Sequence, residues 1–469
     1  MAVVAGEQVG FVDDERILTL LESAKSVERG RALEVVAKAR ECKGLDLEEL
    51  AILLQASDEE VASQIYEAAF YVKNKIYGRR IVFFAPLYVS NVCANNCLYC
   101  AFRTGNKQLE RRVLTESEIH REVEILLSEG HKRVLLVAGE HPKLSGIEYI
   151  EKSVAAVYAT KLGNASIRRV NVNCAPLSVE DFRRLHATGI GTYQCFQETY
   201  HLETYKHMHP SGPKADYLWR LLAPDRAMEA GIDDVGVGAL FGLTDFRFEV
   251  MAVLMHAQYL DSKYGVGPHT ISVPRLEPAL NSDVASHPPH AVGDEEMRRI
   301  VSCFRLAVPY TGIILSTRER AEFRNELIAL GVSQVSAGSR TSPGGYYDAK
   351  AHKPETEQFS IGDDRSLSEV MCRLCKDNYV PSFCTACYRT GRTGERFMGL
   401  AKHGEIHNMC GPNALLSLKE YLIDYAEGDT QVEGERILAE NLEDLSPKMR
   451  RKTMELLAKI EAGERDVYV

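Results

Sequence analysis

The chain has 469 residues, 45% of them hydrophobic and 26% charged, and a formal net charge of −10. This composition is typical of a globular protein and excludes collagen-like and disordered chains. The length predicts two or three compact units, or one large barrel with additions. Because nucleic-acid binding needs a concentrated basic surface, the acidic balance argues against nucleic acid as a partner.

The start of the chain lacks the basic and apolar segments of a secretion signal. An uncharged run from Ile81 to Phe102 contains Pro86, three asparagines and three cysteines, so it is too polar to span a lipid bilayer. We therefore expect a cytoplasmic protein without a membrane partner. Its 12 cysteines are then mostly reduced thiols, and clustered thiols in that compartment indicate metal rather than disulfides.

Residues 1–79 are predicted to form a helical extension, because Leu, Ile, Val and Ala recur there at helical spacing without a strand signal. The helices expected in this extension are Glu15–Ala24, Val27–Lys43 and Ser57–Tyr77.

From residue 80 to residue 345, short apolar runs alternate with amphipathic segments. Eight strands separated by helices over about 260 residues are typical of a (β/α)8 TIM-type barrel, although an open doubly wound sheet gives the same alternation. The expected strands are Ile81–Leu87, Arg133–Ala138, Arg169–Cys174, Gly191–Phe196, Asp234–Ala239, Thr270–Val273, Gly312–Leu315 and Gln334–Ala337. The expected helices are Glu116–Ser128, Ile147–Leu162, Val179–Thr188, Tyr217–Ala230, Phe246–Tyr259, Glu295–Leu306 and Arg318–Leu330.

Residues 346–469 are predicted to form a C-terminal, mainly helical domain that binds a metal cluster. Its first part, residues 346–371, is polar and loop-like, and a group of cysteines follows it. Two helices are expected near Gly411–Tyr425 and Pro447–Ala462.

The first cysteine group, Cys93, Cys97 and Cys100, follows the first barrel strand with the spacing CxxxCxxC. Three thiolates are one short of the four that complete a [4Fe–4S] cubane, so one iron stays open for a small molecule. Zinc is the alternative, but structural zinc sites close with four ligands. The spacing, with the aromatic Tyr99 before the last cysteine, resembles radical S-adenosylmethionine (SAM) enzymes. In those enzymes the open iron chelates SAM, and reductive cleavage gives a 5′-deoxyadenosyl radical.

The second group is a CxxC pair, Cys384 and Cys387, followed after 22 intervening residues by Cys410. Three thiolates again leave one iron of a cubane open. Cys372 and Cys375 lie just upstream, and with Cys384 and Cys387 they could instead close a zinc site. A second iron–sulfur cluster is favoured, because the chain already carries one such motif. The spacing leaves the role of Cys372 and Cys375 open.

Polar residues follow the carboxyl ends of the predicted strands, which form the active-site face of such a barrel. Gly139 permits close approach of the backbone, and Glu140 is a candidate partner of the SAM ammonium. Arg318 offers the two-pronged donor that matches a carboxylate. Each residue also has a plainer interpretation: Glu140 or Glu198 as a solvated loop acid, and Arg318 as a member of a surface ion pair.

The segments FQETYH, GVGALFGL, LSTRE and SAGSRTSPGGY resemble the aromatic amino acid lyases of the biotin synthase-like radical SAM branch. The tail SFCTACYRTGRTGERFMG, with its CxxCx22C spacing, is similar to those members of the family that mature [FeFe]-hydrogenases. This tail is not expected in the thiazole-pathway tyrosine lyases. The resemblance runs from about residue 80 to the end of the sequence and rests on two independent cysteine spacings.

The resemblance implies cleavage of the Cα–Cβ bond of L-tyrosine into p-cresol and dehydroglycine. It further implies conversion of dehydroglycine into carbon monoxide and cyanide at an auxiliary cluster, which are delivered on iron as a precursor for hydrogenase maturation. The implied partners are L-tyrosine, free cysteine at the auxiliary cluster, an electron donor such as ferredoxin or flavodoxin, and other hydrogenase maturation proteins.

The resemblance also implies roles for individual residues. It implies a [4Fe–4S] SAM cluster on Cys93, Cys97 and Cys100, and an auxiliary [4Fe–4S] cluster on Cys384, Cys387 and Cys410 with a further, dangling iron on His269. Alone, His269 would be interpreted as a loop histidine with ordinary hydrogen-bond partners. The candidate SAM contacts are Tyr99, Gly139, Glu140, Asn171, Asn173, Glu198 and Arg220. The candidate contacts to the tyrosine carboxylate are Arg318 and Ser316, with Ser336 and Ser339 as further candidates.

Two other functions compete with this hypothesis. One is a thiazole-pathway tyrosine lyase that supplies 2-iminoacetate, against which the second cysteine group argues. The other is a non-enzymatic carrier of iron–sulfur clusters or zinc. If two clusters lie at opposite ends of a barrel lumen, a short-lived fragment can travel between them, so the lyase hypothesis also predicts an internal passage.

Overall fold

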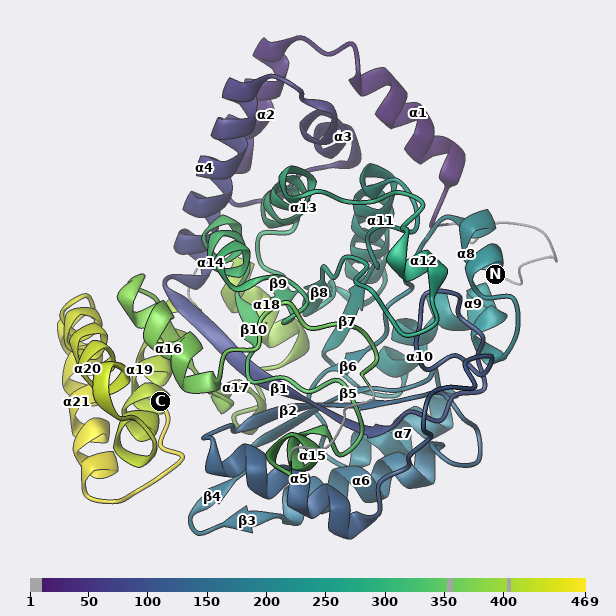
Figure 1. The fold of residues 1–469 in the computed structure, drawn as a ribbon. Helices are drawn as coiled ribbons and strands as arrows, with labels where there is room; N and C mark the ends of the chain where they lie inside the picture. Colours follow the sequence, from purple (N-terminus) through teal and green to yellow (C-terminus); the bar gives the residue numbers. More distant parts are fainter. Residues whose placement is uncertain (1–10, 352–356, 403–405) are drawn as a thin grey trace.

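The computed structural model describes residues 11–351, 357–402 and 406–469. Eight parallel strands close into a barrel, because the last strand pairs with the first at Val82 and Gln334 (Figure 1). This closure confirms the predicted (β/α)8 barrel and excludes an open sheet, which would leave two strand edges unpaired. The barrel strands in spatial order are β1 (Arg80–Ser90), β2 (Arg133–Ala138), β5 (Arg169–Asn173), β6 (Tyr193–Gln194), β7 (Val235–Gly238), β8 (Thr270–Ser272), β9 (Gly312–Leu315) and β10 (Gln334–Ser336).

Helices surround the barrel, and local residues set their ends. A capping box at Thr115 and Glu118 starts the helix that was predicted from Glu116. The predicted helix Tyr217–Ala230 is interrupted at Leu222, because Pro224 lacks the N–H that a continuous helix needs. The helices of this region are α5 (Glu116–Ser128), α6 (Ile147–Ala159), α7 (Val179–Ala187), α8 (Leu202–Met208), η1 (Pro213–Ala215), α9 (Tyr217–Leu221), α10 (Ala223–Glu229), α11 (Phe246–Tyr264), α12 (Asp283–Ser286), α13 (Asp294–Ala307) and α14 (Ala321–Leu330).

The sequence missed a short hairpin after α6. The predicted helix Ile147–Leu162 ends at Ala159, and β3 (Lys161–Leu162) pairs antiparallel with β4 (Ala165–Ser166). The predicted helix from Arg318 begins only at Ala321, so Ser316, Thr317 and Arg318 lie in the loop after β9, where they line a cavity at the barrel mouth.

The N-terminal helices pack on α11 and α13 at the outside of the barrel (Figure 1). They are α1 (Asp14–Ala24), α2 (Arg29–Ala39), α3 (Leu47–Gln55) and α4 (Glu59–Tyr77). The sequence analysis missed α3, although Asp46 and Glu49 form a capping box at its start.

The C-terminal segment adds a strand to the barrel sheet. β11 (Val380–Ser382) pairs in parallel with the first residues of β1, with Arg80 opposite Val380. This strand and the helix before it were missed, because their stretch is short and polar. The helices of this segment are α15 (Gly345–Lys350), α16 (Leu367–Lys376), α17 (Ala386–Arg389), α18 (Gly394–Lys402), α19 (His407–Asp424), α20 (Gly428–Glu443) and α21 (Pro447–Glu461). The domain boundaries at residues 79/80 and 345/346 stay predictions.

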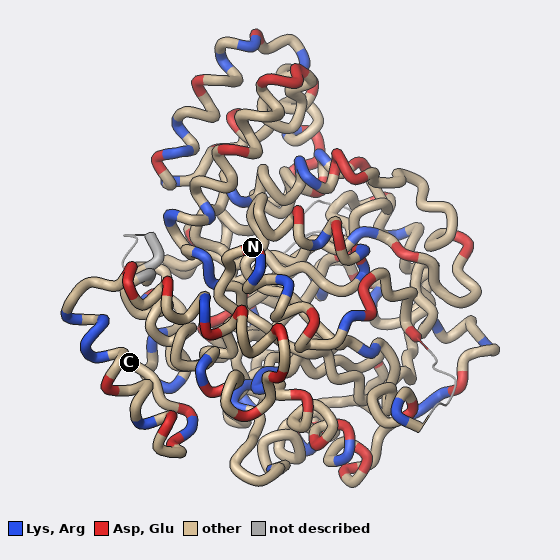
Figure 2. The backbone as a smooth tube through the Cα atoms, turned by 60° about the vertical axis from the view of Figure 1, so that its left-hand side comes forward, with Lys and Arg blue, Asp and Glu red and all other residues tan. Residues whose placement is uncertain are grey.

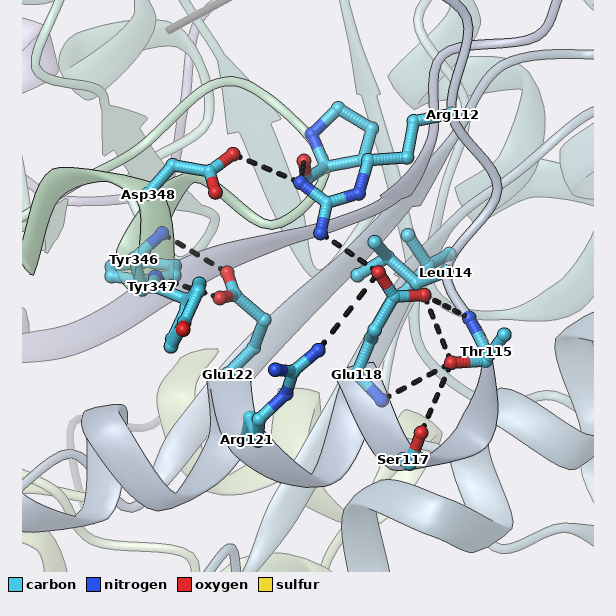
Figure 3. A network of polar contacts seen from close by, with 12 residues as sticks. Arg112, Leu114, Thr115, Ser117, Glu118, Arg121, Glu122, Tyr346, Tyr347 and Asp348 are labelled. Carbon is cyan, nitrogen blue, oxygen red and sulfur yellow. Dashed lines mark hydrogen bonds and ion pairs between the residues drawn. The ribbon is translucent and has the colours of Figure 1, made fainter. Parts of the chain in front are cut away.

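A buried carboxylate fastens α15 to α5. The two carboxylate oxygens of Glu122 accept the backbone N–H groups of Tyr346 and Tyr347 at 3.0 and 2.8 Å (Figure 3). Arg112 pairs with Asp348 at 2.9 Å and so reinforces the same junction. The network holds the segment that continues from the last barrel strand.

No helix among the described residues combines the length and the apolar character needed to cross a lipid bilayer. Figure 2 shows Lys and Arg interspersed with Asp and Glu over the visible parts of the chain, so the acidic excess is spread rather than gathered in one segment.

Two candidate thiol sites at opposite ends of the barrel

The loop after β1 brings Cys93, Cys97 and Cys100 to the wall of one cavity. The cavity measures about 230 Å³ and lies at the carboxyl ends of the barrel strands; we call it the upper cavity. Backbone hydrogen bonds hold the loop: Leu98 N–H donates to the Met208 carbonyl at 3.0 Å. Burial raises the pKa of Cys97 to about 12, so binding of iron to this thiol must release a proton.

The end of β2 lies against the cysteine loop. A Cβ atom at Gly139 would approach the Val92 carbonyl oxygen to 2.5 Å, so only glycine fits there. The Glu140 carbonyl accepts the Ala94 N–H at 2.7 Å, and the Glu140 carboxylate accepts the Asn95 side-chain amide at 2.7 Å. Gly139 and Glu140 therefore shape the loop as well as line the upper cavity.

A buried ion pair lies beside the three thiols. Lys214 Nζ lies 2.6 Å from Glu198 Oε1, and an Arg220 guanidinium nitrogen lies 3.7 Å from the same oxygen. Burial raises the pKa of Glu198, but the two cations outweigh burial and hold that pKa below its ordinary value. Glu198 is thus charged, and all three side chains line the upper cavity.

The remaining candidate SAM contacts divide into two groups. Tyr99 and Asn173 line the upper cavity, and the Tyr99 hydroxyl hydrogen-bonds to His209 Nε2 at 2.8 Å. Asn171 does not line this cavity, and its amide oxygen accepts the Thr192 N–H at 3.0 Å between neighbouring strands. The structure therefore gives Asn171 a role in fastening β5 to β6.

The candidates for the tyrosine carboxylate lie together on another wall. Arg318, Ser316, Ser336 and Ser339 all line the upper cavity. The Arg318 guanidinium carbon lies 3.3 Å from the centre of the Phe359 ring, which orients its donors. The hydroxyls of Ser336 and Ser339 are buried without a hydrogen-bond partner, as expected for groups that face a ligand site.

The structure also brings in residues that the sequence analysis missed. Lys214 reaches Glu198 from the connection after α8, Glu277 follows β8, and Gln358 comes from the segment after the barrel. The Gln358 amide lies 3.7 Å from the Cys100 sulfur, and its oxygen accepts the Tyr88 hydroxyl at 2.7 Å. No motif marks these residues, since only folding brings their segments to the cavity.

Cys384, Cys387 and Cys410 line a second cavity at the opposite end of the barrel, which we call the lower cavity. Cys384 follows β11, Cys387 lies in α17 and Cys410 in the first turns of α19. The Cys387 thiol donates a hydrogen bond to Cys410, which raises the pKa of Cys387 and lowers that of Cys410.

His269 lines the same lower cavity, at the start of β8. Its ring lies 4.9 Å from that of Phe397, and Nδ1 lies 3.6 Å from Asp234 Oδ1. Burial lowers the pKa of His269, so the imidazole is neutral and able to bind a metal. Nδ1 is buried without a hydrogen bond, which favours the predicted metal ligand over a loop histidine with ordinary partners, and the role of His269 stays a prediction.

Cys372 and Cys375 lie on α16 and do not line the lower cavity. Within residues 11–351, 357–402 and 406–469, no three His, Cys, Asp or Glu side chains converge closely enough to hold a single metal ion. Each cavity is lined by three thiols, which is one fewer than the four that complete a [4Fe–4S] cluster.

The two cavities share the interior of one barrel. Phe84, Leu135 and Ile314 form an apolar cluster that lines the upper cavity. The lower cavity is lined by the residues that lie two positions earlier on the same three strands. These residues are Val82, Arg133 and Gly312. Positions two apart in a strand are separated by about 7 Å, so a single layer of side chains divides the cavities.

Comparisons with known proteins agree with this geometry. Residues 87–254 match the Radical SAM superfamily model, and residues 272–380 match that of the Biotin and Thiamin Synthesis associated domain. The 2-iminoacetate synthase of Escherichia coli strain K12 is 33% identical over 78% of this chain and 94% of that protein. A crystal structure of HydG, a maturase of the [FeFe]-hydrogenase, is 52% identical with a TM-score of 0.95, covering 98% of this chain and 100% of that chain. HydG from Carboxydothermus hydrogenoformans is 42% identical with a TM-score of 0.81, covering 95% and 99%.

The barrel and its three-cysteine loop, together with these matches, define a radical SAM enzyme, which uses a [4Fe–4S] cluster and SAM. Cys93, Cys97 and Cys100 are the thiols that fit this cluster. The chain belongs to the family that contains the 2-iminoacetate synthases and the [FeFe]-hydrogenase maturase HydG.

Proposed function

We propose that this protein is a tyrosine lyase that makes carbon monoxide and cyanide for [FeFe]-hydrogenase maturation. Tyrosine is cleaved to p-cresol and dehydroglycine in the upper cavity, and dehydroglycine is converted in the lower one. The observation that carries the proposal is the set of three thiols and His269 at the far end of the barrel. The HydG match spans 98% of the chain and supports it, whereas the 2-iminoacetate synthase match spans 78%.

In the upper cavity, Cys93, Cys97 and Cys100 would hold the cluster, which with SAM would supply a 5′-deoxyadenosyl radical for hydrogen abstraction from the substrate amino group. Arg318 and Ser316 hold the tyrosine carboxylate, and the unpaired hydroxyls of Ser336 and Ser339 complete the polar wall. Glu198 binds a positively charged part of SAM while Lys214 and Arg220 keep the carboxylate ionised. The apolar floor keeps water from the reacting atoms.

In the lower cavity, Cys384, Cys387 and Cys410 would hold the auxiliary [4Fe–4S] cluster. The neutral imidazole of His269 would hold a further iron, which would supply a binding position for free cysteine. The precursor formed there passes to other hydrogenase maturation proteins, and ferredoxin or flavodoxin delivers electrons to the enzyme.

The predicted passage is not open in this structure, because the layer of Phe84, Leu135 and Ile314 separates the cavities, so transfer of the fragment through the barrel interior requires these side chains to move. These side chains are slightly exposed to the interior, at 7%, 9% and 6%, and none of them is charged. An apolar layer delays hydrolysis of an imine, because it excludes water from the route.

The decisive experiment is anaerobic incubation of the reconstituted enzyme with tyrosine, SAM and a reductant, followed by assays for p-cresol, carbon monoxide and cyanide. We expect all three products. Replacement of Cys387 and Cys410 by alanine is expected to abolish carbon monoxide while p-cresol still forms. Cys372→Ala, outside the lower cavity, is the matched control and is expected to make all three products.

Three other outcomes would contradict the proposal. Formation of p-cresol and glyoxylate without carbon monoxide by the wild-type enzyme would favour a thiazole-pathway type lyase. Absence of every product would favour a carrier of clusters. One zinc and about four irons per chain, instead of eight or more irons, would place zinc at the lower thiols.

A second variant tests the internal route. Leu135→Trp fills the dividing layer with a larger side chain, because Leu135 faces the interior. We expect the ratio of carbon monoxide to p-cresol to fall at least about tenfold while glyoxylate, the hydrolysis product, rises. An unchanged ratio would mean that the fragment takes another path.

A further inference from the structure

Three arginines line the lower cavity: Arg392, whose side chain already donates to Met409 Sδ and to the Val469 carbonyl, and the pair Arg80 and Arg133. Arg80 begins β1 and Arg133 begins β2, and both face the cavity of the three thiols. Within the described residues, no carboxylate oxygen lies within 4.0 Å of a nitrogen atom of either guanidinium. Arg80 makes no side-chain hydrogen bond there either, and Nε of both residues is buried and unpaired.

The two guanidinium groups make few other polar contacts. Arg133 is only 6% exposed. Among the described residues its side chain donates one hydrogen bond, to the Cys384 carbonyl at 3.3 Å. Asp234, which lines the same cavity, instead accepts the Gly394 N–H at 3.2 Å and faces His269. Buried guanidinium groups normally meet carboxylates or several carbonyls, so this pair has free donors in a ligand site.

We propose that Arg80 and Arg133 form a carboxylate-binding site beside the auxiliary thiols. The ligand class is a small α-amino or α-imino acid, which can present its nitrogen to the metal while its carboxylate meets the arginines. Guanidinium groups suit this role, because their paired donors match the two carboxylate oxygens. This inference rests on the proposed function, which brings two such acids to the site: the two-carbon fragment and free cysteine.

A plainer explanation is that the two arginines only offset the negative charge of a thiolate-bound cluster. The two explanations differ in what they require of the ligand. If the arginines only compensate charge, a small molecule binds equally well with or without a carboxylate. If they form a carboxylate site, an acid binds much more tightly than its amide.

Glycine is the saturated analogue of the fragment, and glycinamide has the same size and amino group without the carboxylate. Binding is measured on the reduced holoenzyme without SAM by electron paramagnetic resonance. The lower-cavity cluster is identified as the signal that Cys387→Ala protein lacks, and binding is the change in that signal. We expect glycine to bind at least about tenfold more tightly than glycinamide, equivalent to about 1.4 kcal/mol. Equal binding of the two, or no binding of glycine or L-cysteine to wild-type protein, would overturn the proposal.

Variants then assign the effect to the arginines. Arg80→Gln and Arg133→Gln are each expected to weaken glycine at least about tenfold. Arg80→Lys and Arg133→Lys keep the charge that a cluster needs but lose the paired donors, so they too should bind glycine less tightly while retaining iron. Undiminished affinity in the lysine and glutamine variants would overturn the site.

Arg169→Gln is the matched control. Arg169 lies near the same end of the barrel and also has an unpaired Nε, but its two terminal nitrogens donate to the Gly189 and Ile190 carbonyls and it does not line the lower cavity. Its loss should leave glycine affinity unchanged.

A parallel titration with L-cysteine and cysteamine distinguishes the two sources. If only the binding of L-cysteine depends on the arginines, the site serves free cysteine; if only that of glycine does, it serves the fragment. The titrations need no turnover, whereas the proposed function is tested by carbon monoxide release. A negative titration and a missing carbon monoxide signal can therefore be told apart.

Discussion

Lys214 Nζ lies 2.6 Å from Glu198 Oε1, and both side chains are nearly buried, at 10% and 15% exposure. The two residues come from the connection after α8 and from the end of β6, and the Lys214 backbone N–H also donates to Asn95 in the cysteine loop at 2.8 Å. Lys214 therefore joins the buried Glu198 carboxylate to the cysteine loop.

We expect Lys214→Met to lower 5′-deoxyadenosine formation at least about tenfold and to lower the free energy of unfolding by about 3 kcal/mol, because the buried Glu198 carboxylate loses its nearest cation. The measurements are 5′-deoxyadenosine per iron and urea unfolding. Lys206→Met breaks an exposed pair with Glu203 on the neighbouring helix and should change neither. Equal effects of the two substitutions would refute the role of the buried pair.

Gly139→Ala is expected to disturb the cysteine loop, because the new Cβ would lie 2.5 Å from the Val92 carbonyl oxygen. The backbone must shift, at a cost of about 1–3 kcal/mol, and the upper cluster should be lost preferentially. Iron content and SAM cleavage measure the effect. Gly30→Ala, on a helix with no atom within 4 Å of the new Cβ, should be neutral or slightly stabilising. A Gly139→Ala protein with full iron content would contradict the prediction.

Glu122 predicts a pH dependence of stability. Burial raises its pKa from 4.5 to about 7, while in the unfolded chain it titrates at its ordinary value. Between these values the folded state binds more protons, so the free energy of unfolding falls as pH rises, by on the order of 3 kcal/mol in total. Urea unfolding of metal-free wild-type and Glu122→Gln protein at pH 5 and pH 8 tests this. The variant should show a flatter dependence, and identical slopes would count against it.

The last residues of the chain support the auxiliary thiols. Asp466 forms ion pairs with Arg389 on α17 and with Arg168, and the Val469 carbonyl accepts a hydrogen bond from Arg392 at 3.0 Å. Asp466→Asn should therefore speed the loss of iron from the lower site to a chelator by several-fold, with upper-site iron unchanged. Glu443→Gln, which breaks an exposed pair with Arg450, is the control. Equal rates for both variants and the wild type would refute this support.

Much of the molecule follows from patterns within short segments. The eight barrel strands were predicted from alternating apolar runs, and the two cysteine spacings from positions a few residues apart. The misses have the same origin. α3 was overlooked despite its capping box, and β11 is a three-residue strand whose pairing partner lies 300 residues away, at Arg80 opposite Val380.

The sequence by itself determined the alternation of strands and helices and the spacing of both cysteine groups, because spacing along a strand, a helix or a tight loop is a local property. Folding determined which residues face one another. It placed His269 and Cys384 on the wall of one cavity and Lys214 beside Glu198, and among the residues that the structure describes it left Arg80 and Arg133 without a carboxylate within 4.0 Å. Such contacts depend on the packing of segments that are remote in the chain, and no periodicity within a segment encodes them.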